Sequence, residues 1–169
     1  MLVCGIDPGT AITGFGLVRE NPDGSLAAVD FGVIQTEAEL DMPTRLLELH
    51  RKMNELLLLH HPESAAVEKL FFQRNVRTAL SVGQARGVAL LALAEAGLPV
   101  AEYTPLEVKQ AVAGYGGADK NQVQQMVRAL LGLQDIPRPD DAADALAIAI
   151  CHIHSASFKN LTNPEGGKG

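Results

Sequence analysis

The first 35 residues, MLVCGIDPGTAITGFGLVRENPDGSLAAVDFGVIQ (Met1 to Gln35), decide the fold. They contain three short β-rich runs, which are Leu2 to Asp7, Thr13 to Arg19 and Leu26 to Gln35. The two connections contain Pro and Gly where turns need them, and they are Asp7-Pro8-Gly9-Thr10 and Asn21-Pro22-Asp23-Gly24. Because consecutive strands joined by short turns pair with each other, this stretch predicts an antiparallel three-strand meander.

The rest of the chain alternates between helical and β patterns. Apolar spacing and capping signals predict helices at Pro43 to His60, Val76 to Ala96, Thr104 to about Ala113, Asn121 to Leu131 and Ala142 to about His154. Two further short strands are expected at Ser64 to Glu68 and Pro99 to Tyr103. The right-handed crossover rule then gives an α/β fold, a mixed five-stranded sheet of three antiparallel and two parallel strands with helices on both faces.

Length and composition favour one domain. With 169 residues and 47% hydrophobic content, the chain can bury one core but not two full-sized ones. We expect the domain to span residues 1–156, followed by a flexible tail, residues 157–169, that is rich in Gly and has no apolar period. No apolar run is long enough for a membrane span, and the first residues have no basic segment typical of a signal peptide. These features indicate a cytoplasmic protein.

The net charge of −6 is unevenly distributed along the chain. Residues 1–68 carry eleven acidic and four basic side chains, whereas residues 69–128 carry seven basic and four acidic ones. The middle of the chain could therefore form a local basic face on an acidic protein, although an ordinary solvated surface would give the same counts.

Two acidic residues are expected at the carboxyl ends of buried strands. Asp7 ends the first strand, where open α/β sheets place ligand-binding groups. Glu68 ends the apolar run Ala65 to Val67, on a strand that should lie beside the first one. Each has an ordinary alternative, since Asp7 could bond amides of its own turn and Glu68 could be a solvated loop residue.

Two more acidic residues begin the last predicted helix. Asp141 and Asp144 are three residues apart and therefore share one helical face. Acids in a first turn also cap free amides and favour the helix dipole, and either Asp140 or Asp141 could serve that purpose. Asp144 is harder to explain in this way because small and apolar residues surround it, from Ala142 to Ile148.

Together these four carboxylates would repel one another unless a cation neutralised them. All-oxygen ligands favour Mg²⁺ or Mn²⁺ over zinc. Two such ions could activate water and stabilise the leaving oxygen during attack on a phosphodiester, so the sequence predicts metal-assisted phosphoryl transfer. The five histidines have no convincing ligand spacing, and Cys4 and Cys151 are too far apart in sequence for a CxxC site.

Four motifs follow one another along the chain: Gly5-Ile6-Asp7-Pro8-Gly9-Thr10 with Thr13-Gly14-Phe15-Gly16, Glu68 followed by Phe71, Gly83-Gln84-Ala85-Arg86-Gly87, and Asp141 to Ala147. Taken in this order, they resemble the RuvC family of bacterial Holliday-junction resolvases. The resemblance covers about Met1 to His154. It implies a ribonuclease-H-like fold and a homodimer whose two sites make paired nicks in strands of like polarity of a four-way DNA junction, during recombination and repair.

The resemblance also implies roles for individual residues. Asp7, Glu68, Asp141 and Asp144 match the family's acids, although some members have His at the position of Asp141. Lys109 and Lys120 match its two active-site lysines, which would contact the scissile phosphate or its neighbours. The family further implies a partner, a branch-migration motor complex of the RuvA and RuvB type.

The loop after Glu68 is the expected DNA-facing segment. Phe71 matches the family's junction-facing aromatic residue, and Phe72 lies beside it. Aromatic rings stack on unpaired bases of any sequence, while Arg74 and Arg77 could hold phosphates. One of the two rings could instead pack in the core. The helix from Val76 to Ala96 is a candidate for the dimer interface, although its apolar positions could equally serve the core.

Three other functions fit parts of the sequence. The Gly-Ile-Asp-x-Gly-Thr loop is similar to that of ATP-binding relatives of actin and the sugar kinases, but those proteins need two such lobes. A related nuclease acting on structured RNA would share the first motif and the fold. A junction-binding module without activity would not need the complete set of acids.

Overall fold

The structure, a computed structural model, describes residues 1–70 and 76–162, without the side chains of Arg77 and of residues 158–162. Within this part the chain forms five strands and five helices. The strands are β1 (Leu2–Asp7), β2 (Ile12–Glu20), β3 (Leu26–Gln35), β4 (Ser64–Glu68) and β5 (Val100–Tyr103). The helices are α1 (Met42–His60), α2 (Val76–Glu95), α3 (Pro105–Ala113), α4 (Lys120–Leu130) and α5 (Asp140–Thr162).

All five strands belong to one mixed sheet with the order β3-β2-β1-β4-β5. The strands β1, β2 and β3 pair antiparallel, β4 pairs parallel with β1, and β5 pairs parallel with β4. This arrangement confirms the predicted sheet. The central strand β1 is buried along nearly its whole length, because neighbouring strands flank it and helices cover both of its faces.

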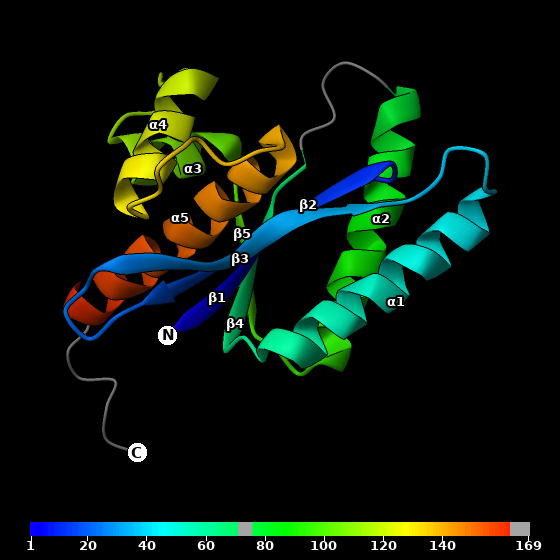
Figure 1. Ribbon diagram of the computed structural model, residues 1–169, viewed down its shortest axis with the longest axis horizontal. Coiled ribbons are helices and arrows are strands. Elements are labelled where there is room, and N and C mark those ends of the chain that lie inside the picture. The colour runs from blue at the N-terminus through cyan, green and yellow to red at the C-terminus, as the bar shows by residue number, and fades with distance from the viewer. Residues whose placement is uncertain (71–75, 163–169) are drawn as a thin grey trace.

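Helices cover the sheet on two sides (Figure 1). On one side Ile6, Val67 and other sheet residues pack against α1 and α2 in one apolar cluster. On the other side Val3 and Ala66 belong to a second cluster built largely from α5, to which α3 and α4 also contribute buried residues. The two clusters make a three-layer domain, as the expected α/β fold requires.

Local signals set most helix boundaries. Asp41 caps α1 by accepting a hydrogen bond from the backbone N–H of Thr44, and Pro43 lies in the first turn. Thr104 and Glu107 form the capping box predicted for α3. A second capping box, formed by Asp119 and Gln122, starts α4.

The last helix is longer than predicted. It continues to Thr162, whereas the sequence predicts an end near His154 and a flexible tail from residue 157. Residues 157–162 are therefore helical, and at the start of this extension the hydroxyl of Ser157 donates to a carboxylate oxygen of Glu20 at 3.1 Å. The helical pattern escapes sequence reasoning because no apolar period marks it. The domain boundary near residue 156 stays a prediction, and residues 163–169 lie outside the described residues.

Candidate active site

Asp7 and Glu68 lie side by side at the carboxyl ends of two parallel strands. Ile6 is opposite Val67 in the register of β1 and β4, so Asp7 and Glu68 are the next residues along. Ile6 and Val67 face α1 and α2. Because successive side chains alternate between faces, both carboxylates point to the opposite face, which α5 covers.

The first turns of α5 bring Asp141 and Asp144 to this corner. Gly14, the partner of Asp7 in the register of β1 and β2, lies against the backbone of Asp141. A Cβ atom on Gly14 would overlap the carbonyl oxygen of Asp141, and one on Gly5 would overlap the next turn of α5. Glycine at these two positions therefore lets the helix approach the sheet closely enough to place its acids beside Asp7.

The charges of this group act on Asp7 most strongly. The pKa of the Asp7 carboxyl is raised from 3.8 to about 7, first by burial and then by the charges of Glu68, Asp144 and Asp141. The charge of Lys120 opposes this shift. Because the carboxyl of Asp7 is within electrostatic reach of the other three acids, the four acids form one electrostatic cluster.

The pKa values of Glu68 and Asp144 are raised in the same way, and lysines oppose these shifts too. Burial, and next the charge of Asp144, raise the pKa of Glu68, whereas Lys109 and Lys120 act to lower it. Burial also raises the pKa of Asp144 against the influence of Lys120. The two lysines that match the family's pair therefore both lie within electrostatic reach of the acids, Lys109 from α3 and Lys120 from the start of α4.

Lys120 contacts two acids at once. Its ammonium nitrogen lies 3.3 Å from a carboxylate oxygen of Asp144 and 3.3 Å from one of Asp140. The buried Gln124 also donates to Asp140 at 3.2 Å. Asp140 thus ties the first residues of α4 to the start of α5, a role that sequence reasoning missed because the position of Asp140 indicates only a helix cap.

These acids do not form a ready metal cage. Within the described part of the chain, no group of three or more His, Cys, Asp or Glu side chains is arranged so that it could hold a metal ion. The donor set is nevertheless the type that hard divalent cations prefer, since it consists of carboxylates that three elements bring to one corner of the sheet. Burial and the neighbouring charges both disfavour the ionised form of Asp7, and a divalent cation there would offset them.

Comparison with known proteins assigns the chain to a family. The family model described as "Crossover junction endodeoxyribonuclease RuvC" matches residues 3–152. A protein of that name from Desulfitobacterium hafniense is 62% identical over 167 residues, which cover 99% of each chain. The chain belongs to the RuvC family.

Solved RuvC structures have the same fold. The Thermus thermophilus RuvC structure superposes with a TM-score of 0.88 at 42% identity, covering 94% of this chain and 97% of the other. T. thermophilus RuvC in complex with a Holliday junction substrate gives a TM-score of 0.86 at 39% identity, covering 94% and 96%. These matches confirm the ribonuclease-H-like fold predicted from the sequence.

Four residues expected at the DNA lie beyond what can be placed. Phe71, Phe72 and Arg74 fall outside the described residues, as does the side chain of Arg77. Their roles in a RuvC protein stay predictions.

Among the described residues, no helix is both long and apolar enough to cross a lipid bilayer.

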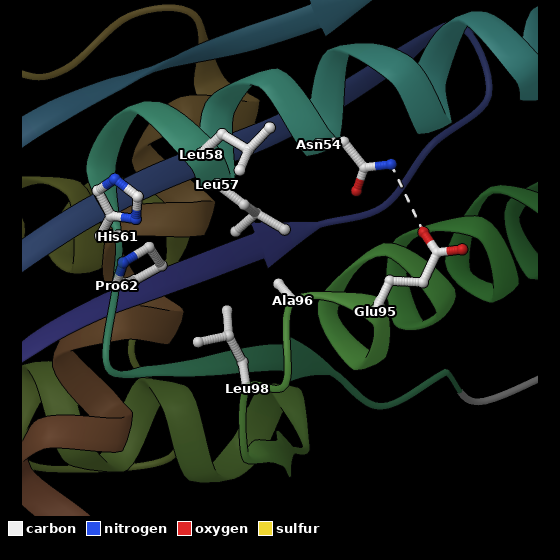
Figure 2. A pocket seen from close by; sticks show the side chains of 8 residues that line it. All are labelled: Asn54, Leu57, Leu58, His61, Pro62, Glu95, Ala96 and Leu98. Atoms are coloured by element: carbon white, nitrogen blue, oxygen red, sulfur yellow. Dashed lines mark hydrogen bonds between the residues drawn. The ribbon is translucent and has the colours of Figure 1, made fainter.

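An apolar hollow of about 370 Å³ lies at the other end of the sheet from the acids. Figure 2 shows its lining, in which Leu57 and Leu58 of α1 face Leu98 across the opening and Asn54 donates a hydrogen bond to Glu95. Pro62 lies two residues before β4 begins, whereas Glu68 ends that strand. The hollow is therefore separate from the carboxylate cluster of this RuvC protein.

Proposed function

We propose that this chain is a structure-specific endonuclease that resolves four-way (Holliday) DNA junctions. It makes paired, symmetric, divalent-metal-dependent nicks in strands of like polarity during recombination and DNA repair. Membership of the RuvC family supports the activity, and the related T. thermophilus RuvC forms a complex with a Holliday junction as its substrate. A cytoplasmic location, where bacterial DNA is accessible, is part of the proposal.

The observation that carries the proposal is the cluster of four acids on β1, β4 and α5. Asp7, Glu68, Asp141 and Asp144 would hold Mg²⁺ or Mn²⁺, two ions for each site, as two-metal nucleases do. When bound, such ions polarise the scissile phosphate and make water a better nucleophile. The acids must be ionised to bind a cation, and the raised pKa of Asp7, about 7, means that cation and proton compete for this carboxylate near neutral pH.

The two lysines would act on the phosphate beside the acids. Lys120 is 56% exposed, so its ammonium group can leave Asp144 and Asp140 and contact a DNA phosphate at little cost. Lys109, on α3, is close enough to Glu68 to lower its pKa and would contact a neighbouring phosphate. Both would neutralise charge that develops on the phosphate during attack.

The remaining parts of the proposal concern partners. Phe71 would stack on an unpaired base at the junction, with Phe72 beside it, while Arg74 and Arg77 would hold phosphates. Two copies of the chain would form a homodimer, because symmetric nicking of opposite strands needs two sites. A branch-migration motor complex of the RuvA and RuvB type would deliver the junction.

The test is cleavage of strand-labelled four-way junctions with Mg²⁺ or Mn²⁺. A DNA junction, a linear DNA duplex and an RNA junction are compared, with Asp7→Asn as the inactive control. Symmetric paired nicks in the DNA junction alone would support the proposal. Cutting of the RNA junction instead, or nicking by Asp7→Asn in Mg²⁺, would contradict it.

A further inference from the structure

Buried threonines hold the loop that follows Asp7. Among the described residues five polar side chains are buried, and three of them are Thr10, Thr13 and Thr36. All three contact the loop between β1 and β2 or belong to it. A buried hydroxyl needs a hydrogen-bond partner, and the partners here show what the loop is fixed to.

Thr13 closes the loop on itself. The hydroxyl of Thr13 donates to the carbonyl oxygen of Gly9 at 2.7 Å and accepts from the N–H of Gly9 at 3.2 Å. Because Thr13 lies at the start of β2, these two bonds set the path of the chain between Asp7 and the second strand. They do not by themselves fix the loop relative to the helices.

Thr10 makes the link to a helix. Its hydroxyl donates to the backbone carbonyl of Ser81 at 2.7 Å, so the loop is bonded to α2 in the region where Figure 1 draws the two side by side. Ser81 lies in the second turn of α2, and a helical carbonyl can accept a second bond because it has two lone pairs. α2 is also the helix that follows residues 71–75, the segment proposed to face the junction.

Thr36 holds the same residue from the other side. Its hydroxyl donates to the carbonyl oxygen of Thr10 at 2.7 Å and accepts from the side chain of Arg45 on α1 at 2.9 Å. Hydrogen bonds therefore run from α1 through the end of β3 to Thr10 and on to α2. Apart from the bonds between Gly9 and Thr13, Thr10 is the residue of this network that lies closest in sequence to Asp7.

These hydrogen bonds have a physical purpose at this position. The carboxylate of Asp7 lies among like charges, which act to push it out of the cluster. The loop after Asp7 has to resist that force for the acids to stay close enough to share a cation. Hydrogen bonds to two helices and a strand end provide this resistance.

We propose that Thr10 is a positioning residue that fixes the Asp7 loop to α2 and so keeps Asp7 in the geometry needed to bind a divalent cation. The inference rests on the proposed function, since it takes Asp7 as a metal ligand. It adds that the position of α2 and the metal affinity of the site are coupled through the hydroxyl group of Thr10.

The test compares Thr10→Val, which keeps the shape but loses the hydroxyl, with Thr10→Ser, which keeps the hydroxyl. Mn²⁺ alone is titrated into the full chain, and the concentration of half-saturation is measured. We expect Thr10→Val to raise that concentration about threefold to tenfold, the effect of one buried hydrogen bond, and Thr10→Ser to stay within about twofold of the parent. The Mg²⁺ concentration for half-maximal junction nicking should shift in parallel, while junction binding in chelator stays the same.

Ser64→Ala is the matched control, because Ser64 is also a buried hydroxyl but lies at the opposite end of β4 and bonds to His152. It should lower the melting temperature without moving the Mn²⁺ midpoint. If Thr10→Val lowers the melting temperature but leaves that midpoint unchanged, Thr10 is only structural and the inference is wrong. If the parent chain itself neither binds Mn²⁺ nor nicks the junction, the proposed function has failed, which is a distinguishable result.

Discussion

Replacing Asp7 with Asn should make the metal-free protein more stable, although it should abolish cleavage. The folded state buries the Asp7 carboxyl and places it among other acids, which raises its pKa from 3.8 to about 7. Between these values the folded protein binds the proton more tightly than the unfolded chain does. Stability is therefore lost as the pH rises from about 4 to about 7, and it stays lost above that range.

The size of this effect follows from the shift. About three pKa units at about 1.4 kcal/mol each set an upper limit of about 4 kcal/mol at pH 8. The charge is shared among several neighbouring acids and part of the site faces solvent, so we expect about half of that, about 2 kcal/mol. For a chain of this length, that corresponds to a rise in melting temperature of about 4 to 8 °C.

The assay is thermal unfolding of Asp7→Asn and the parent chain in EDTA, at pH 8 and at pH 4. The difference should be largest at pH 8 and nearly vanish at pH 4, where the carboxyl is largely protonated in the folded state. Asp135→Asn, which removes an exposed carboxylate in the turn after α4, is the control and should change little. An Asp7→Asn variant no more stable than the parent at pH 8 would refute the electrostatic argument.

Three further predictions concern other parts of the structure. Lys120→Gln should slow junction nicking about a hundredfold in single-turnover cleavage, while gel shifts in chelator show junction affinity changed by less than about threefold. Equal losses in cleavage and in affinity would exclude a catalytic role for this lysine. Gly14→Ala should destabilise the fold by at least about 2 kcal/mol in urea unfolding, because the added Cβ atom would overlap the backbone of Asp141 on α5. Unchanged stability would mean that the helix can move away. Thr104→Ala should cost about 1 kcal/mol by breaking the capping box of α3, without moving the pH profile of cleavage, and a variant that melts with the parent would show that the cap contributes nothing.

Much of the architecture could be predicted because its signals are local. The turns after Asp7 and Asn21 fix the meander, and the capping box at Thr104 fixes the start of α3. The position of Glu68 next to Asp7 follows from one topological rule, since a helix-linked strand adds in parallel beside the first. Sequence reasoning therefore predicted both strand-borne acids at the same edge of the sheet.

Other features depend on contacts between residues distant in sequence, which no local pattern reports. The close approach of α5 over Gly5 and Gly14 is a property of three elements together. The bond from Thr10 to the carbonyl of Ser81 joins residues 71 positions apart, and a threonine in a turn sequence gives no sign of it. The shared contact of Lys120 with Asp140 likewise needs the packing of α4 on α5.

The order in which the site's acids occur along the chain bears on when the protein can first act. Asp7 and Glu68 emerge early during synthesis, but Asp141 and Asp144 belong to α5, whose packing over β1 and β2 joins segments at opposite ends of the domain's sequence. Contacts of such long range form late, because the closure entropy of a long loop must be overcome first. A nascent or truncated chain that ends before α5 would thus lack half of the carboxylates and leave one face of β1 uncovered. Cleavage competence should appear in the same step as the final docking of this helix, so that a partly folded chain cannot cut DNA.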